Sequence, residues 1–490
     1  MGTNERPFTS KAPMELARGL VQGVMSAPGE GRGVWWHQGT FWVWYGGRWQ
    51  RRTVREMENG VMMLLDGAMV VKGKMEAEGP RTERLVVTPV LAANVTRCLE
   101  ALVQCPKVEL PAWVGEGPGP FAQENRVLAF RDVLVEVGTD TKVERDHRWL
   151  DPVCLPVDFR GEVGWKELEG TTFRRCLEEW SNGDERWVEL DRMWGGYQML
   201  PWRGANRWLL KHGKIQAGKT TRDLLMKELL GQAMVSSTMN ELSGEFGLSG
   251  MANVRALVIN DAEELDERRR QRFSSQLKVM VGADFTTINE KGMPLIRDVK
   301  LGCAVSMNAN LMPAMANEGQ GVSGKMLVLP YERSMIGKAD AKLLERLKGE
   351  LDLVAAWYYG GAVKVVGEAD RGAVQWPVTG AAEEHVWAFR LKNNPWDAFL
   401  EARFVKQPGG FVPSRLIWRE WLDFARENQV ATRVARNALT MELVGKSTWD
   451  VRRRRHPHTQ ERGLEGLGWR KVPEDEGREQ VRVVEGEENP

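Results

Sequence analysis

Short apolar runs alternate with helical patterns through the middle of the chain. The run Trp208–Leu210 precedes a glycine-containing loop, and residues 222–230 follow with apolar positions at helical spacing. Two more apolar runs, 254–260 and 303–310, each end in polar residues. Strands that alternate with helices predict a parallel sheet covered by helices, so we expect an α/β nucleotide-binding domain over residues 207–362.

The regions on either side have different patterns. Alternation at Phe41, Val43 and Tyr45, followed by Gly46-Gly47, predicts a small β-hairpin. Three short helices and a basic, strand-like end after residue 383 favour a winged-helix module. The other predicted elements are helices near 53–71, 90–104, 395–405, 414–428 and 431–444, a strand pair over 126–136, and a helical region over 165–200.

Composition narrows the class of protein. With 490 residues, 42% hydrophobic and 28% charged, the chain is expected to form about two to four soluble domains. Its net charge is only +1, so contacts to DNA have to come from local clusters. The five cysteines form no Cys-x-x-Cys pair, which argues against zinc, and no apolar stretch approaches the ~20 residues of a membrane span. We expect a cytoplasmic protein with no membrane partner.

Tryptophan is unusually frequent, with 21 residues against 5 tyrosines. Five of the tryptophans lie between Trp35 and Trp49, in the predicted hairpin. Such a surface could stack on single-stranded bases. We favour the alternative, in which these tryptophans form the core of the hairpin.

The glycine-containing loop reads Gly213-Lys-Ile-Gln-Ala217-Gly218-Lys219-Thr220, and Thr221 follows it. A strand before it and a helix after it are the context of a phosphate-binding P-loop. In such a loop the backbone N–H groups surround a triphosphate, and Lys219 reaches the β- and γ-phosphates. The Thr220 hydroxyl binds Mg²⁺. We therefore predict ATP and Mg²⁺ as ligands.

Polar residues at the ends of the next two apolar runs are candidates for catalysis. Asp261 is the predicted metal-linked acid, and Glu263 is the alternative for positioning the attacking water. Asn310 is the predicted sensor of the γ-phosphate, with Asn308 as its rival, because an amide can donate to phosphate and hold water at once. Acids after a strand also cap helices, and asparagine is common in turns.

Between these two runs, residues 278–300 predict a hairpin with Lys291 at its tip. A cation at this position could contact a phosphate backbone, together with Arg297 and Lys300. A lone turn lysine is more often simply solvated.

Taken in order, these motifs resemble the superfamily 3 helicase domain of phage and plasmid primase-helicases, a group that includes the poxvirus type. Gly196-Tyr197 resembles the end of the segment ahead of the family's P-loop, and Gly282-Ala-Asp284 resembles its Gly-Gly-Asp turn. Asn310-Leu-Met-Pro313 resembles its Asn-x-x-Pro sensor. Lys325-Met-Leu-Val-Leu-Pro330-Tyr331 and Leu353-Val-Ala-Ala-Trp357-Tyr-Tyr-Gly360 resemble its following strand and helix.

The resemblance implies an α/β fold with an AAA+-like P-loop ATPase core, an N-terminal mainly helical domain and a C-terminal winged-helix domain. The expected parts are a flexible N-terminus (1–25), an N-terminal domain with the Trp-rich β-hairpin (26–164), a helical collar (165–206), the superfamily 3 ATPase domain (207–362), a winged-helix-like DNA-binding domain (383–472) and an acidic tail (473–490).

The implied activity is that of an ATP-dependent hexameric helicase. It would move 3′→5′ on single-stranded or forked DNA and replicate a phage, plasmid or other mobile element in a bacterial or phage-infected cell. The basic run Arg452, Arg453, Arg454 and Arg455, with His456 and Arg462, would contact DNA. The alternative is an origin-binding or assembly ATPase that remodels DNA or recruits replication partners without processive unwinding.

Two departures from the family are evident. The paired arginines before its Pro-containing strand are here Gly324-Lys325, so either Lys325 or Arg333 would act as the trans-acting cation. No Asp-x-Asp strand motif of a primase lies in the first 120 residues. Priming would then come from a separate primase or polymerase.

Overall fold

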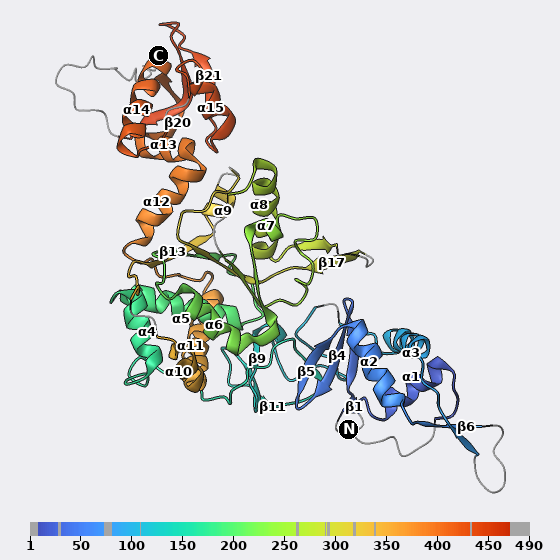
Figure 1. Cartoon of the computed structure of the whole chain (residues 1–490). Coiled ribbons are helices and arrows are strands. Elements are labelled where there is room, and N and C mark those ends of the chain that lie inside the picture. The colour runs from blue at the N-terminus through green and yellow to red at the C-terminus, as the bar shows by residue number, and fades with distance from the viewer. Residues whose placement is uncertain are drawn as a thin grey trace, which may run out of the picture. The chain divides into compact units, whose positions relative to one another are not determined.

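The computed structural model describes residues 8–27, 31–72, 81–107, 109–260, 264–289, 291, 295–316, 320–337, 340–431 and 434–470. The chain forms two compact units (Figure 1). Unit 1 comprises Met1–Ala316 and Gly324–Val386, and unit 2 comprises Asn317–Ser323 and Trp387–Pro490.

The first part of unit 1 contains three helices and a three-stranded antiparallel sheet. The helices are α1 (Pro13–Gln22), α2 (Val54–Leu65) and α3 (Pro89–Leu102), and the sheet contains β3 (Val34–His37), β4 (Thr40–Tyr45) and β5 (Arg48–Arg52). The predicted hairpin is confirmed, because Gly46 and Gly47 have φ of 59° and 76° between β4 and β5. Trp35, Trp42 and Trp49 are buried, as the core interpretation requires.

One helix prediction in this region was too long. Helix α2 starts with a capping box between Thr53 and Glu56, but it ends at Leu65 rather than at residue 71. Asp66 leaves the helical conformation and Gly67 has a φ of 75°. The apolar residues after them form β6 (Met69–Val71), which pairs with β7 (Thr82–Arg84).

Small sheets connect this part to the next. The predicted strand pair is present as β9 (Val127–Ala129) and β10 (Val133–Glu136), with β11 (Lys142–Glu144) on the other side of β10. The remaining short pairs are β1 (Ser26–Ala27) with β2 (Gly31–Arg32) and β8 (Ala112–Trp113) with β12 (Trp149–Leu150).

A five-stranded parallel sheet forms the centre of unit 1. Its order is β14-β15-β18-β13-β19, so β13, the first of these strands in the chain, lies between the last two. The strands are β13 (Trp208–Gly213), β14 (Met234–Ser237), β15 (Ala256–Ile259), β18 (Ala304–Ala309) and β19 (Met326–Tyr331). The apolar runs of β15 and β18 are buried along their whole length, which is typical of a parallel sheet covered on both faces.

Helices cover this sheet. Figure 1 shows α4, α5, α6, α10 and α11 gathered together, apart from α7 and α8. Their bounds are α4 (Thr172–Ser181), α5 (Glu185–Met199), α6 (Lys219–Leu230), α7 (Met239–Leu242), α8 (Glu267–Gly282), α10 (Leu343–Gly349) and α11 (Leu351–Asp370). The short 3₁₀ segments are Glu124–Arg126 and Gly231–Ala233, and the hairpin strands are β16 (Phe285–Ile288) and β17 (Ile296–Lys300).

Helices α5 and α11 approach backbone to backbone. A Cβ atom on Gly196 would lie 2.1 Å from the Ala362 nitrogen, and one on Gly361 would lie 1.9 Å from the Arg192 carbonyl oxygen. Only glycine permits this distance. The Gly-Tyr segment singled out in the sequence therefore has a packing role.

Unit 2 combines helices with a three-stranded antiparallel sheet of order β20-β22-β21. In chain order its main elements are α13 (Pro395–Arg403), β20 (Phe404–Pro413), α14 (Ser414–Glu427), α15 (Leu439–Lys446), β21 (Arg452–Arg455) and β22 (Arg462–Trp469). Helix α12 (Ala382–Asn393) runs from unit 1 into unit 2, and α9 (Gln320–Ser323) is assigned to unit 2.

The third helix of unit 2 starts later than the predicted 431–444. Gln429 adopts a φ of 54° after α14, and α15 begins at Leu439. Leu439 and Leu443 then reach the core that contains Phe399 and Trp421. The Ala438 N–H donates to the Ala435 carbonyl oxygen at 2.9 Å, so a turn precedes the first turn of α15.

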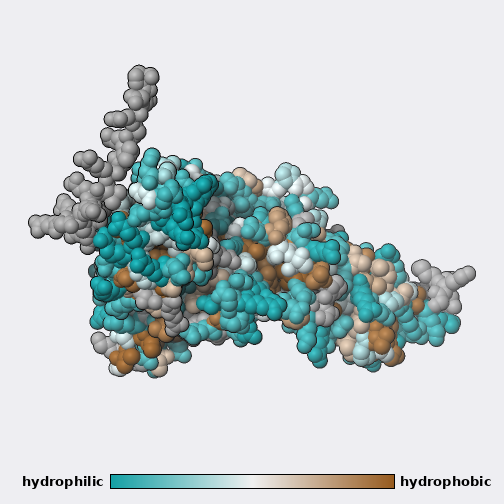
Figure 2. All heavy atoms as spheres, turned by 90° about the horizontal axis from the view of Figure 1, so that it is seen from above, coloured by the Kyte–Doolittle hydropathy of each residue, from teal (hydrophilic) through white to brown (hydrophobic). Residues whose placement is uncertain are grey.

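Among the described residues, none of the helices combines the length and apolar character needed to cross a membrane. Figure 2 shows one face of the molecule, on which hydrophilic residues predominate and hydrophobic ones form separate patches.

The close packing of α5 and α11 predicts the effect of added volume. Gly196→Ala should cost about 1–3 kcal/mol through overpacking, which lowers the midpoint of thermal unfolding by roughly 5 °C. The matched control is Gly367→Ala in α11, where a Cβ atom meets nothing within 4 Å and the midpoint should stay level or rise. Equal midpoints for the two variants would contradict this packing.

Candidate functional site

The glycine loop, residues Gly213–Thr220, connects the end of β13 to the start of α6. Gly213 has a φ of 143° and Gly218 a φ of 99°. A Cβ atom on Gly213 would lie 2.2 Å from the Tyr331 carbonyl oxygen, and one on Gly218 would lie 2.1 Å from Trp180 Nε1. Both positions therefore require glycine, on conformational and steric grounds.

Lys219 is the buried residue at which α6 begins. Its ammonium donates to the carbonyl oxygens of Gly213 at 3.0 Å and Lys214 at 2.7 Å, and to Asn310 Oδ1 at 2.9 Å. The structure thus brings together two residues that lie 91 positions apart in the sequence. An anion in the loop would meet an ammonium that is already held in place.

The other predicted ligands of the loop differ in exposure. Ala217 is buried, Thr220 on the first turn of α6 is exposed, and Thr221 is intermediate. The Thr220 hydroxyl is accessible to a cation. Asp261 and Glu263 lie outside the described residues. In the sequence they follow Asn260, the first residue after β15.

Asn308, the rival of Asn310, makes different contacts. Its Nδ2 donates to Asp223 Oδ2 at 2.7 Å and to Asn260 Oδ1 at 3.3 Å. Its Oδ1 is buried and has no hydrogen-bond partner in the described part of the chain. Of the two asparagines, it is Asn310 that contacts Lys219.

A cleft of about 710 Å³ opens over the glycine loop. Sequence reasoning missed most of the residues that line it outside the loop. Arg175, Glu179 and Trp180 come from α4, and the segment before and within α10 contributes Asp340, Leu343 and Leu344. No local pattern could identify these residues, because only the fold brings α4 and α10 to the loop.

Buried charges lie beneath the glycine loop. Arg222 Nε donates to Asp191 Oδ1 at 2.8 Å, and both side chains are fully buried. The Tyr358 hydroxyl donates to Asp191 Oδ2 at 3.0 Å, which ties α6, α5 and α11 to one carboxylate. Lys211 of β13 pairs with Asp223 of α6. Burial lowers the pKa of Lys211 to about 8, although the Asp223 carboxylate opposes this shift.

A histidine pair adjoins the loop. His212, the residue before Gly213, has its Nδ1 2.8 Å from Nδ1 of His385 in α12. Burial, and then the neighbouring His385 and Lys219, lower the pKa of His212 to about 4. Burial also lowers the pKa of His385, against the opposing charges of Glu332 and Glu384.

The two candidate trans-acting cations lie at opposite ends of β19. Lys325 precedes the strand, and its Nζ is 3.4 Å from Asn206 Oδ1. Arg333 follows the strand and is exposed. The residue after it, Ser334, donates through its hydroxyl to the carbonyl oxygen of Ile215 in the glycine loop at 2.9 Å. Arg333 is thus near its own glycine loop, whereas Lys325 is at the far edge of the sheet.

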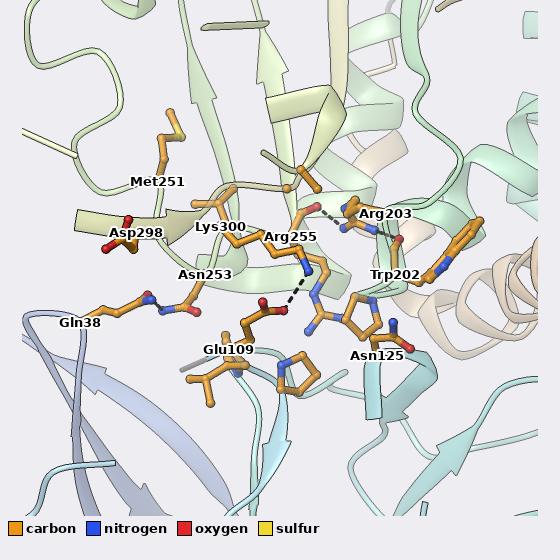
Figure 3. A pocket seen from close by; sticks show the side chains of 17 residues that line it. Gln38, Glu109, Asn125, Trp202, Arg203, Met251, Asn253, Arg255, Asp298 and Lys300 are labelled. Atoms are coloured by element: carbon orange, nitrogen blue, oxygen red, sulfur yellow. Dashed lines mark hydrogen bonds and ion pairs between the residues drawn. The ribbon is translucent and has the colours of Figure 1, made fainter. Parts of the chain in front are cut away.

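The predicted hairpin is present, with β16 and β17 antiparallel and Lys291 exposed between them. Arg297 is exposed, whereas Lys300 Nζ lies 3.0 Å from Glu109 Oε2. Figure 3 shows the side chains of Lys300 and Glu109 pointing toward each other in the lining of a cavity of about 160 Å³. Lys300 therefore already has an acidic partner within the chain.

Buried arginines form the inner wall of this cavity. Arg203 donates to the Arg255 carbonyl oxygen (Figure 3). Arg255 pairs with Asp151 at 2.8 Å. Burial lowers the pKa of Arg203 to about 10. Carbonyl and carboxylate oxygens thus accept from both guanidinium groups, although the buried Arg203 Nε has no hydrogen-bond partner among the described residues.

The basic run Arg452–Arg455 is strand β21 of unit 2, and all four residues are exposed. It pairs with β22 in an antiparallel register that places Arg455 opposite Arg462. The predicted strand-like basic end is confirmed.

Comparison with known proteins adds a partial family match. A model described as a family of unknown function (DUF5906) matches residues 212–347, from the glycine loop into α10. None of the curated proteins matches the chain. Among solved structures, two apo structures of the NrS-1 C-terminal region have TM-scores of 0.45 and 0.46 at 9% and 11% identity. They cover 89% and 94% of this chain and 96% and 100% of theirs.

The buried pair predicts a large effect from one substitution. Arg222→Met should destabilise unit 1 by about 3–5 kcal/mol, because Asp191 is left as an uncompensated buried charge. We expect the midpoint of thermal unfolding to fall by roughly 10 °C. The control is Arg174→Met, which breaks a partly exposed pair with Glu178 and should cost about 1 kcal/mol or less. Similar losses for both variants would contradict a special role of the buried pair.

The histidine contact predicts a pH dependence. The pKa of His212 is lowered from 6.5 to about 4, so the contact is complete above pH 6.5 and is lost as pH falls toward 4. A second proton would make both facing nitrogens donors. Hydrogen exchange in the first turn of α12, corrected for intrinsic rates, should be faster at pH 5 than at pH 7. In His385→Phe this difference should disappear, and its persistence would assign the effect to another group.

Proposed function

We propose that this protein is an ATP-dependent DNA helicase with a P-loop ATPase core. The observation that carries the proposal is the position of Lys219 under the cleft, where two carbonyl oxygens and Asn310 hold its ammonium. Carbonyl and amide oxygens are weaker partners for an ammonium than phosphate is, so a triphosphate would replace them. Thr220 and Asp261 would bind Mg²⁺, and Glu263 would position water.

The order of the sheet supports an AAA+-like core. Strand β13 carries the glycine loop between β18, which carries Asn310, and β19. Parallel strands present their carboxyl ends at one edge, where ligands bind in open α/β sheets. The P-loop and the γ-phosphate sensor of the proposed ATPase would both lie at that edge.

Exposed apolar residues around the glycine loop support a ring. Ile215, Leu224, Leu311 and Ile336 are all exposed, and they belong to the loop, to α6 or to segments that contact the loop. Exposed apolar groups near a polar cleft suit a surface that another subunit covers. We propose a hexamer in which ATP binds between subunits and Lys325 or Arg333 completes the site.

DNA would pass along the β16–β17 hairpin, with Lys291 and Arg297 available for phosphates. The order of helices and strands in unit 2 supports a winged-helix module that holds duplex DNA. We propose that the protein serves replication of a phage, plasmid or other mobile element, together with a separate primase or polymerase. The runner-up is an assembly ATPase without processive unwinding. The Lys300–Glu109 pair favours this runner-up, because the Glu109 carboxylate already binds one of the hairpin cations.

The test measures ATP hydrolysis and displacement of an annealed oligonucleotide. Unmodified protein should do both, and DNA should stimulate hydrolysis. Lys219→Ala should lower hydrolysis by about 10²–10³-fold and abolish displacement, because the phosphates lose their main cation. The control is Lys364→Ala, an exposed lysine of α11 paired with Glu189, which should leave both rates unchanged.

Persistent hydrolysis in Lys219→Ala would show that the P-loop assignment is wrong. DNA-stimulated hydrolysis without displacement would favour the runner-up.

A further inference from the structure

A cleft of about 640 Å³ in unit 2 is lined by arginines from four segments. They come from the start of α14, the residues before α15, strand β21 and the start of β22. The six are Arg415, Arg436, Arg453, Arg454, Arg455 and Arg462. Asn437 and Thr440 add polar side chains to the same cleft.

The alternation of β21 separates its four arginines into two pairs. Arg453 lies opposite Leu464, and Arg455 lies opposite Arg462, so these two share the face that packs toward the core of unit 2. Arg452 lies opposite Glu465 on the other face. Arg454 nevertheless also lines the cleft, so of the four arginines of the run only Arg452 lies outside it.

Ion pairing, rather than the side of the strand, separates Arg452 and Arg454 from Arg453 and Arg455. Arg454 Nε donates to Glu465 Oε2 at 3.1 Å, and Arg452 lies 3.4 Å from Asp450. In the cleft, Arg415 pairs with Glu461. The other cleft arginines have no carboxylate within ion-pairing distance among the described residues: Arg436, Arg453, Arg455 and Arg462.

Four guanidinium groups without a carboxylate partner in the described part of the chain, gathered around one cleft, suit a polyanion as ligand. Like charges at this distance repel one another, and anion binding removes the repulsion. The cleft is too large for a single phosphate to fill. A nucleic-acid backbone, with a charge every ~3.4 Å along each strand, supplies several phosphates to one site.

Helix α15, which packs beside β21, offers little to read bases. Its exposed positions are Met441, Val444, Gly445 and Lys446. Lys446 is already paired with Glu442. Base edges in the major groove are usually read by Arg, Asn or Gln, and side chains of these types lie in the cleft before α15, at Arg436 and Asn437, rather than on the helix itself.

We infer that this cleft binds the phosphate backbone of DNA through Arg436, Arg453, Arg455 and Arg462. The inference rests on the proposed function for its choice of DNA as the polyanion. Within the basic run it assigns phosphate binding to Arg453 and Arg455. It excludes Arg452 and Arg454, because each of them already pairs with an acidic side chain.

The test uses the full chain without nucleotide and a fluorescent duplex of about 20 base pairs. Binding is measured by anisotropy between about 50 and 200 mM salt. The double variant Arg453→Gln/Arg455→Gln should weaken binding by about 10-fold per lost contact and should reduce the slope of log K against log salt by about 2. The matched control, Arg452→Gln/Arg454→Gln, removes the same charge from the same strand and should change affinity less than about 3-fold.

Equal losses in the two double variants would overturn the inference, because general charge would then explain binding. Unchanged binding in the cleft variant would overturn it too. A single-stranded probe of the same length shows whether the cleft prefers single-stranded or duplex DNA. A loss of binding in the cleft variant but not in the control variant, with either probe, supports the inference. ATP hydrolysis by the unmodified protein is measured in parallel. Absence of ATP hydrolysis would reject the proposed function. An incorrect assignment of the cleft would change only the result of the DNA-binding measurement.

Discussion

The fully buried pair between Arg222 and Asp191 fixes the position of the candidate site. Arg222 lies one helical turn after Gly218, so the first turn of α6 has the glycine loop at its start and a buried guanidinium at its end. Asp191 also accepts from the Tyr358 hydroxyl, and the adjacent Asp223 binds Lys211 of β13. Moving α6 would separate buried charges from their partners, which costs several kcal/mol. The loop is therefore held rigidly at its helical end.

The same charges extend to the neighbouring strand. Asp223 accepts from Asn308 of β18, while Asn310, directly after the strand, accepts from Lys219. Both asparagines therefore contact side chains of α6. A phosphate that binds the Lys219 ammonium competes with Asn310 for it, while Asn308 keeps β18 attached through Asp223. Nucleotide binding could thus change the end of β18 without detaching the strand.

Sequence patterns identified what depends on local order. The strand, loop and helix around Lys219, the hairpin at Lys291 and the basic strand at Arg452 are all present, because each is encoded by neighbouring residues. Trp180 over the loop, the His212–His385 contact and the Lys300–Glu109 pair could not be predicted. Each joins residues far apart in the sequence, and their chemistry is ordinary until the fold brings them together. The start of α15 could not be predicted either, since periodicity alone left it open.

The two candidate trans-acting cations imply different assemblies. Strand β19 has six residues and spans about 20 Å, so Lys325 and Arg333 cannot both reach one phosphate group within a subunit. Arg333 emerges beside its own glycine loop and could act without a partner subunit. Lys325 emerges at the opposite edge of the sheet and could reach only a nucleotide bound by another copy. If Lys325 is the required cation, hydrolysis depends on assembly, and a monomer would bind ATP without turning it over.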